Sequence, residues 1–526
     1  MNTETAHPSI RRFFQMPLLR CEEAFDRFFG GVDNPLRHLG ALGLYLLWII
    51  VGTGLYLYAV LDTGVAQVYS SIGYLSEEQW YLGGILRSLH RYASDAFILV
   101  MVLHLVREWA YGRYTGFRFY SWITGIPLIW LAFASGIGGY WIVWDQLAQF
   151  SAVATTELLD WLPIFSEPSA RNFLAPDTVN DRLFTLLVFI HIGLPILMMA
   201  GLWAHVHRIA HVDHLPSGKL MRGTALALLV LSLLKPALSD APANLATTPA
   251  ETRLDWFILF IHPLTDLSSP AVIWALLFAL TALLFALPFL SRRKSAAVAI
   301  VDPANCNGCA RCQIDCPYGA VIMAPHPTRR SYQVAQVDAD LCASCGICAG
   351  SCPSSTPFRS REQLITGIDM PQLPVNALRA DLELKLAALT GKTRIVVFGC
   401  DHGASLASIA AADTAVMRLI CTGMLPPSFV EYALRTGADG VLVANCREGG
   451  CEYRLGERWT RERLTRQREP QLREKVPVER LQIAFVSAND SRQLHHILIE
   501  FRARIEAEAD STKKLQPYLR RTAHHA

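Results

Sequence analysis

Four histidines lie in apolar segments as two pairs of equal spacing, His90 with His104 and His191 with His205. Fourteen residues of α-helix turn through roughly 1400°, within about 40° of whole turns, and rise roughly 21 Å. Each helix would therefore present two imidazoles on one face, about two-thirds of a bilayer core apart. Two such helices facing each other could bind two haems, one above the other. One histidine could be a packing residue, but two matched pairs favour haem ligation, since ionisable groups in membranes usually have a function.

Twelve of the 13 cysteines follow residue 300, at the spacing of metal ligands rather than scattered over loops. This clustering indicates a reducing cytoplasm around the C-terminal half. The run C-x2-C-x2-C-x3-C-P occurs twice, which is the signature of a two-cluster ferredoxin in which each fourth cysteine serves the other cluster. One [4Fe–4S] cluster is assigned to Cys306, Cys309, Cys312 and Cys352, and the other to Cys342, Cys345, Cys348 and Cys316. A zinc site would favour two CxxC motifs with longer gaps. The remaining early cysteine, Cys21, is expected to be a plain thiol at the membrane surface.

The last four cysteines follow a strand pattern. Strands are predicted at 394–399, 416–420, 440–445 and 483–486, with helices between them, which favours an α/β domain with a parallel sheet. The carboxyl ends of parallel strands share one edge, where such folds bind ligands. The cysteines at or just beyond these ends are Cys400, Cys421, Cys446 and Cys451. They suit a [2Fe–2S] cluster or zinc; buried structural cysteines are the alternative.

The elements that position these residues fall into a membrane half and a soluble half. The chain has 526 residues, of which 52% are hydrophobic and 18% charged, so it is too apolar for an ordinary soluble protein. Its net charge of +3 indicates no particular partner, and no nucleic-acid partner is expected. Six segments are long enough to span a bilayer: 39–60, 84–107, 120–142, 182–206, 220–238 and 270–291. Residues 9–30 look amphipathic and could lie on a membrane surface.

The predicted fold is therefore a membrane α-helical bundle of six transmembrane helices, a ferredoxin-like α+β domain and an α/β parallel-sheet domain. The expected divisions are a surface segment at 1–30, four helices at 31–218, two helices at 219–293, a ferredoxin domain at 300–358, a linker at 359–393, the α/β domain at 394–507 and a tail at 508–526. Many arginines occur at 454–475, as either a solvated helix face or a docking surface for an acidic partner.

Basic residues predict the orientation. They follow the second, fourth and sixth segments, the last group being Arg292, Arg293 and Lys294. By the positive-inside rule both termini and the iron–sulfur domains are cytoplasmic, while 143–181 and 239–269 face outward. The start of the chain predicts no cleavable signal peptide. The expected location is a bacterial cytoplasmic (inner) membrane.

The membrane half resembles a known family. The stretches 83–109, 124–146 and 189–207 closely resemble the cytochrome b of bc-type quinol-oxidising complexes, a resemblance covering residues 9 to about 293. It implies that His90 and His191 bind a haem nearer the outer side, that His104 and His205 bind one nearer the cytoplasm, and that Arg87 pairs with a haem propionate. Four glycines, also fourteen apart in pairs, would leave room for the macrocycles or serve helix packing: Gly40, Gly54, Gly125 and Gly139.

The resemblance also implies quinone sites. Residues 219–293 resemble the separate small subunit of the plastid-type version, whose Pro-Glu-Trp-Tyr motif is matched here by Leu254, Asp255, Trp256 and Phe257. Asp255 keeps a carboxylate that could accept a quinol proton. The candidate catalytic residues are Asp255, Trp256 and Tyr140. Three residues at the cytoplasmic end, His38, Arg208 and His211, could line an inner quinone pocket or have no such role. His38 stands where the plastid-type protein has a cysteine tethering an extra haem, and no third haem is expected.

The last domain resembles the delta subunit of methyl-viologen-reducing hydrogenase. The match lies in VFGC (397–400), CTG (421–423), ADGVLV (438–443) and C-x4-C (446–451). The resemblance implies a [2Fe–2S] cluster that passes electrons to a flavin-containing disulfide-reductase subunit. Members often have a second cysteine where this chain has Gly403.

Together these features predict a quinone-linked oxidoreductase subunit. It would connect the quinone pool, through two haems b and three iron–sulfur clusters, to a cytoplasmic flavoprotein of the disulfide-reductase or NAD(P)H-oxidoreductase kind. Ferredoxin clusters lie near about −400 mV, so electron flow from quinol to them would need the membrane potential or a bifurcating site. A homodimer within a larger complex is expected from the resemblance. The alternative is a non-catalytic membrane anchor and conduit. A full bc-type complex would need a Rieske partner, because this chain has no Cys-x-His…Cys-x2-His motif.

Overall fold

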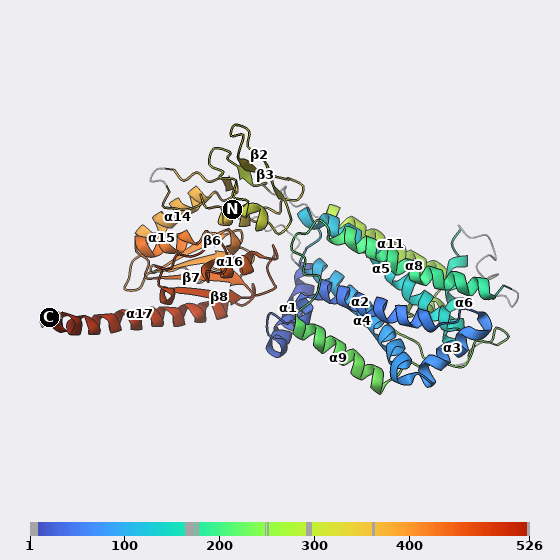
Figure 1. Cartoon of the computed structure of the whole chain (residues 1–526). Coiled ribbons are helices and arrows are strands. Elements are labelled where there is room, and N and C mark those ends of the chain that lie inside the picture. The colour runs from blue at the N-terminus through green and yellow to red at the C-terminus, as the bar shows by residue number, and fades with distance from the viewer. Residues whose placement is uncertain are drawn as a thin grey trace. The chain divides into compact units, whose positions relative to one another are not determined.

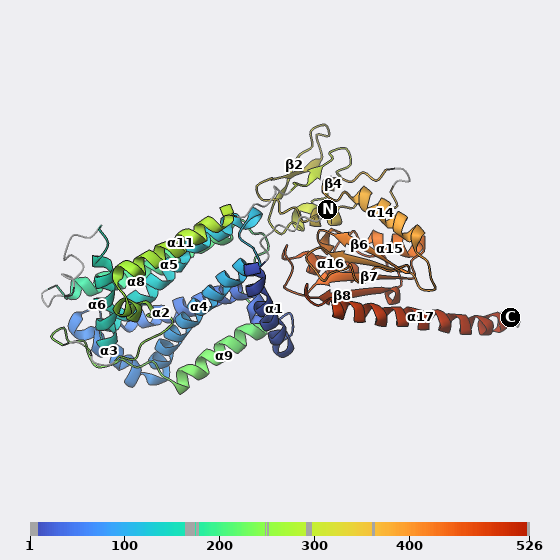
Figure 2. The same ribbon diagram turned by 180° about the vertical axis from the view of Figure 1, so that it is seen from behind.

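A computed structural model describes residues 9–163, 174, 178–247, 249, 252–290, 297–359 and 363–522. The basic residues Arg292, Arg293 and Lys294 lie outside these described ranges. The chain forms two compact units, one comprising 1–207 with 212–293 and the other 208–211 with 294–526. Figures 1 and 2 show the helical first unit and the mixed second unit, which are described separately below.

Five helices of the first unit are long and apolar enough to cross a membrane, counting only described residues. They are α2 (Leu39–Val60), α4 (Ile85–Ala110), α5 (Phe119–Val143), α8 (Asp181–Val206) and α11 (Pro270–Leu290). The expected fifth segment is instead α9 (Gly218–Leu234), which has 17 residues and stops before Lys235-Pro236. A helix of that length rises about 25 Å, near the lower limit of roughly 17 residues for a membrane span. Five described helices therefore meet the length and composition of a span, and the sixth span stays a prediction.

The long helices pack as two pairs, α2 along α4 and α5 along α8. In both views α11 lies beside α5, and α9 lies beside α4 (Figures 1 and 2). The core between them is aliphatic and aromatic, with Leu46, Phe97, Leu128 and Met198 buried. Shorter elements connect the spans: η1 (Pro35–Arg37), α3 (Val65–Glu77), η2 (Trp80–Gly84), η3 (Gly116–Arg118), α6 (Gln146–Asp160) and α10 (Ile261–Leu267).

The first helix, α1 (Ser9–Phe29), buries its polar face and exposes its apolar one. Glu22 is 3% exposed and accepts a hydrogen bond of 2.8 Å from Arg107 Nε. Phe13 and Phe28 are 71% and 86% exposed. An outward row of phenyl rings is the property expected of a helix lying on a membrane surface.

The ferredoxin-like part of the second unit consists of two similar halves. β1 (Ile300–Val301) pairs antiparallel with the distant β4 (Ile368–Asp369), and β2 (Val321–Pro325) forms a hairpin with β3 (Gln333–Val337). The short helices are α12 (Arg311–Ile314) and α13 (Ile347–Ser351). Each cysteine run places left-handed residues at matching positions, Gly308 and Ala310 in the first and Ser344 and Gly346 in the second. These bends curl each run around a centre, as a cluster-binding loop requires.

The α/β part has a four-stranded parallel sheet in the order β6-β5-β7-β8. The strands are β5 (Ile395–Cys400), β6 (Thr414–Leu419), β7 (Gly440–Cys446) and β8 (Leu481–Val486), each within two residues of its predicted bounds. On one face lie α14 (Val375–Ala388) and α15 (Ser428–Thr436), and on the other lies α17 (Ser491–Thr522) (Figure 1). The connections contain η4 (Thr422–Met424), α16 (Gly456–Leu464) and η5 (Val478–Arg480).

Two parts of this unit differ from the sequence-based expectation. The linker expected at 359–393 contains α14, because Val375, Leu378, Leu382 and Leu386 recur at helical spacing and bury themselves against the sheet. The tail expected from residue 508 is helical in its backbone as far as Thr522.

Replacing Phe398 with alanine is expected to lower the unfolding free energy of the α/β domain by about 3–5 kcal/mol, because its fully buried ring fills the core on one face of β5. Hydrogen exchange of the β5 amides in the intact protein measures this loss. The control is Leu384→Ala on α14, where the side chain is 72% exposed. Equal protection in the two variants would contradict the prediction.

Candidate metal centres

The four histidines face the interior of the membrane unit. His90 and His104 lie on α4, and His191 and His205 lie on α8. The ring centroids of His90 and His191 are 6.2 Å apart. A metal–imidazole bond is about 2 Å long, so two bonds in line to one metal would separate the ring centres by about 6 Å. The spacing of this pair therefore fits a single iron bound between the two rings.

Hydrogen bonds orient the outer imidazoles. Nδ1 of His90 lies 3.0 Å from the Ile50 carbonyl oxygen, and Nδ1 of His191 lies 3.0 Å from that of Ser135. A carbonyl only accepts, so each Nδ1 donates a proton and each Nε2 keeps its lone pair for a metal. In the inner pair, Nδ1 of His205 lies 3.3 Å from Thr124 Oγ1. Such partners are typical of metal-bound histidines.

Each of the four glycines faces one histidine. A Cβ added at Gly54 would lie 3.0 Å from His90 Cε1, one at Gly125 would lie 3.1 Å from His205 Cε1, and one at Gly139 would lie 2.8 Å from His191 Cε1. At Gly40 the distance to His104 Cε1 is a relaxed 3.9 Å. The sequence suggested that these glycines make room for macrocycles. In the structure that room is taken by the imidazole of the neighbouring helix.

The other residues expected around haem and quinone are dispersed. Arg87 donates to the hydroxyls of Ser76 and Ser239, at 2.6 and 2.9 Å. His38 Nε2 lies 2.8 Å from the Val32 carbonyl oxygen. Arg208 and His211 group with the iron–sulfur unit, where His211 Nε2 lies 2.9 Å from the Ile314 carbonyl oxygen. The structure therefore assigns the last two to a different unit from His38.

Asp255 belongs to a buried polar cluster. Its side chain is hydrogen-bonded to the Tyr140 hydroxyl, and it also shares a hydrogen bond with Asp95. Arg91 Nη2 lies 3.9 Å from Asp255 Oδ2. Two neighbouring carboxyl groups beside a phenol make this cluster a candidate site for binding a proton. The neighbouring Trp256 is 68% exposed.

An apolar cavity of about 600 Å³ opens between α5, α8 and α11. Its lining includes Pro127, Trp130, Leu197 and Phe285. Such a lining suits a hydrocarbon chain. His38, Arg208 and His211 are not among its lining residues.

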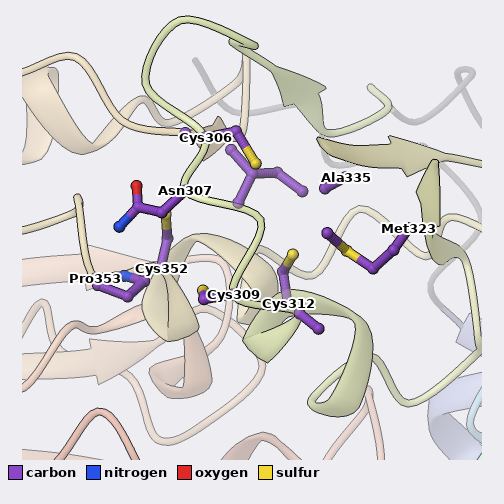
Figure 3. A pocket seen from close by; sticks show the side chains of 11 residues that line it. Cys306, Asn307, Cys309, Cys312, Met323, Ala335, Cys352 and Pro353 are labelled. Atoms are coloured by element: carbon purple, nitrogen blue, oxygen red, sulfur yellow. The ribbon is translucent and has the colours of Figure 1, made fainter. Parts of the chain in front are cut away.

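The first set of ferredoxin cysteines surrounds one void. Cys306, Cys309, Cys312 and Cys352 all line one small cavity, with Met323 and Ala335 on the side away from the cysteine loop (Figure 3). Burial raises the pKa of Cys312 to about 12, and the other three thiols add to the rise. Among the described residues no three His, Cys, Asp or Glu side chains meet as the ligands of a single ion. In a [4Fe–4S] cluster each iron instead takes one of four cysteine sulfurs, and the arrangement fits that need.

The second set is equally close together and more deeply buried. Burial raises the pKa of Cys348 well above its usual value, and Cys345, Cys316 and Cys342 contribute further. These are the four residues that the repeated run assigns to the second cluster.

The last four cysteines converge at the carboxyl edge of the parallel sheet. Cys400 and Cys446 end β5 and β7, and Cys421 follows β6. Hydrogen bonds from Cys421 and Cys446 hold the pKa of Cys400 well below its usual range, and Cys451 is bonded to the same two thiols. Gly403 lies 4.0 Å, measured from an added Cβ, from Cys446 Sγ. All four thiols are buried and fit a small cluster.

The sequence analysis missed two groups of residues. Arg91 and Asp95 are ionisable side chains one helical turn apart within a transmembrane segment, and that alone is a signal of function. Arg463 was hidden in the arginine-rich stretch 454–475, but it is fully buried against Asp315, the residue before Cys316. Part of that stretch is thus neither a solvated face nor free for an outside partner.

Three families match separate parts of the chain. Residues 33–212 match cytochrome b/b6/petB, residues 292–356 match the 4Fe-4S dicluster domain, and residues 395–507 match methyl-viologen-reducing hydrogenase, delta subunit. A chain of a solved "Hyperthermophilic respiratory Complex III" is 20% identical, with a TM-score of 0.41, over 55% of this chain and 82% of that chain. The likeness of 219–293 to a separate small subunit stays a prediction. The five apolar helices and these family matches show that the chain is a membrane electron-transfer subunit. It combines a haem-binding cytochrome b part with iron–sulfur domains.

Proposed function

We propose that this subunit carries electrons between quinone in the membrane and a flavin-containing protein in the cytoplasm. The carriers would be two haems b, two [4Fe–4S] clusters and one [2Fe–2S] cluster. One observation carries the proposal: two pairs of imidazoles in the membrane helices and three sets of four cysteines in the second unit belong to one chain.

His90 with His191 would hold one haem, and His104 with His205 would hold the other. Haem contributes a reversible one-electron change of its iron. The protein itself orients the imidazole rings. The carbonyl oxygens of Ile50 and Ser135 accept hydrogen bonds from Nδ1 of His90 and His191, and the four glycines leave space for the rings to pack against the adjacent helix. Arg87 would interact with a propionate of a bound haem.

Asp255 would receive a proton when quinol is oxidised. The Tyr140 hydroxyl donates to its carboxylate, and Asp95 offers a second carboxyl group for the proton. Asp95 Oδ1 is buried and has no hydrogen-bond partner among the described residues, so it could pass the proton onward. Phe257 lacks the hydroxyl of the family's tyrosine, and Tyr140 supplies a phenol from α5 instead.

Energetics favour electron flow toward quinone. Ferredoxin-type clusters lie near about −400 mV and reduce quinone readily. The reverse direction needs the membrane potential, worth about 2.3 kcal/mol per charge per 100 mV, or a bifurcating site. We infer from the basic loops that both termini and the iron–sulfur unit lie in the cytoplasm of a bacterial cell. The bc-type resemblance supports a homodimer within a larger complex.

A non-catalytic anchor is the second candidate, and the altered outer motif favours it. Trp256 is 68% exposed and the motif's proline and tyrosine are replaced by Leu254 and Phe257. Tightly bound quinone in the purified protein, or inhibition by quinone-site blockers, would support the catalytic role. An anchor should show neither.

The His104→Leu variant tests the haem assignment. We expect one haem b per chain in place of two, with the electron paramagnetic resonance signals of the iron–sulfur clusters unchanged. The protein should be purified anaerobically with its partners and measured by the dithionite-reduced visible spectrum and metal analysis, where the unaltered chain should carry about ten irons in clusters. The control is His207→Leu, since His207 stacks on Trp203 at the end of the same helix as His205. Two haems in His104→Leu would refute the assignment.

A further inference from the structure

The ferredoxin-like part and the α/β part of the second unit meet at glycines. A Cβ at Gly350 in α13 would collide with the Gly423 carbonyl oxygen in η4. One at Gly423 would lie 2.9 Å from Ile347 Cγ1 and 2.9 Å from Gly456 Cα. The backbones of α13, η4 and α16 are therefore in direct contact, which only residues without a side chain permit.

Thiols of two different cysteine sets share the core of this junction. Cys345 of the ferredoxin-like part packs in one buried cluster with Cys421 and Cys451 of the α/β part. Ile347 and Trp459 complete that cluster. Cys345 interacts electrostatically with Cys451 as well as with Cys316 and Cys342 of its own set. The Cys306 set lines a separate cavity to which no α/β cysteine contributes.

A buried ion pair crosses the same junction. Arg463 from α16 is 0% exposed and donates to Asp315 Oδ2 at 2.5 Å, to Ser351 Oγ at 2.5 Å and to the Gly423 carbonyl oxygen at 2.8 Å. Asp315 also accepts from Arg468 Nη1 at 2.6 Å, and Arg468 stacks on Trp459. Buried charges are tolerated only when paired and hydrogen-bonded, so the network holds the two parts in one relative position.

The bonded residues adjoin the proposed cluster ligands. Asp315 precedes Cys316, a ligand of the second [4Fe–4S] cluster, and Ser351 precedes Cys352, a ligand of the first. The helix that carries Arg463 begins at Gly456, which touches Cys421 Sγ. One side chain thus links the backbone segments of all three cysteine sets.

We propose that Arg463 is a positioning residue that clamps the ferredoxin-like part onto the α/β part, so that the cluster at Cys342, Cys345, Cys348 and Cys316 exchanges electrons directly with the cluster at Cys400, Cys421, Cys446 and Cys451. This inference rests on the proposed function for the identity of the clusters. The exchange moves one electron, oxidising one cluster as the other is reduced, with no bond or proton changed. In this order of carriers, the cluster at Cys306, Cys309, Cys312 and Cys352 would be the one that does not exchange electrons directly with the [2Fe–2S] cluster.

The test uses the full chain, purified anaerobically and reduced stepwise with dithionite. In the unaltered protein we expect electron paramagnetic resonance signals from three clusters. The [2Fe–2S] signal should be broadened, and its electron spin should relax at least tenfold faster than that of an isolated cluster, because a paramagnetic cluster lies close to it. Arg463→Met should keep the iron and sulfide content but lose this enhancement. It should also be cleaved at the junction at least tenfold faster by protease. Arg463→Lys, which keeps the charge, should restore most of both properties.

Arg461→Met is the matched control, since Arg461 lies on the same helix, is 38% exposed and pairs with Glu448. It should behave as the unaltered protein. If Arg463→Met fails to retain clusters, Gly350→Ala disturbs the same junction from the ferredoxin side and should give the same loss of enhancement. An unchanged [2Fe–2S] relaxation in the altered protein would overturn the clamp. Three clusters that are present but magnetically isolated in the unaltered chain would overturn the order of exchange alone, whereas missing clusters would overturn the proposed function.

Discussion

Gly139→Ala is expected to remove one of the two haems. The added methyl carbon would lie 2.8 Å from His191 Cε1, well inside the roughly 3.5–4.0 Å of ordinary carbon contact. The ring cannot move aside freely, because Nδ1 is bound to the Ser135 carbonyl oxygen of the same helix as Gly139. A misplaced axial ligand or its supporting group typically costs 10- to 100-fold in metal affinity. The haem content per chain, from the pyridine haemochrome spectrum, should fall from about two to about one.

The neighbouring glycine gives a close control. A Cβ at Gly138 meets nothing within 4 Å, so Gly138→Ala makes the same chemical change one residue away without touching His191. It should keep both haems. Equal haem content in the two variants would show that the Gly139 contact is irrelevant to binding. Loss of haem from both would show that haem binding is sensitive to any methyl group added at this part of α5, whatever the position of the imidazole.

Asp255→Asn is expected to slow quinol oxidation by at least about 100-fold, because a carboxamide cannot accept the proton that general-base catalysis requires. The change preserves shape, so Tyr140 can still donate to the remaining oxygen. The measurement is the rate at which a soluble quinol analogue reduces the haems, with the visible spectrum recorded to show that both haems remain.

The control for this rate is Asp266→Asn, an exposed carboxylate eleven residues further on. It should leave the rate unchanged. If Asp255→Asn oxidised quinol at full speed and was still stopped by a quinone-site blocker, the proton would have to leave by another group. If neither the variant nor the unaltered chain oxidised quinol at all, the anchor role would be favoured.

Regular elements could be predicted from the sequence because their signal is local. Apolar runs of bilayer length gave five helices, and β-branched runs gave all four strands of the parallel sheet. The C-terminal bound of the segment at 220–238 was placed four residues too far along, because hydropathy does not register that Lys235-Pro236 ends α9. The helix at 375–388 was missed because Pro371 and Pro374 suggested a linker. Its apolar stripe stabilises the helix by packing against the sheet, and that contact cannot be seen in the sequence.

Some residues of the candidate sites could be recognised from the sequence and others could not. Histidine and cysteine sets are visible as spacings, so their convergence in space could be expected. The cluster of Asp95, Tyr140 and Asp255 could not, because its members lie on separate segments up to 160 residues apart and meet only through tertiary packing. The same holds for Arg463 and Asp315, whose 148-residue separation hides a buried pair inside an apparently solvated stretch.

The pairing of helices has a consequence for biogenesis. Each glycine–histidine contact lies within one pair, α2 with α4 or α5 with α8, and each pair is a continuous stretch of chain. The two imidazoles that would share an iron come from different pairs. Each pair is therefore a local unit of biogenesis, and incorporation of the porphyrins would add ligand bonds between two helix pairs that already share one apolar core.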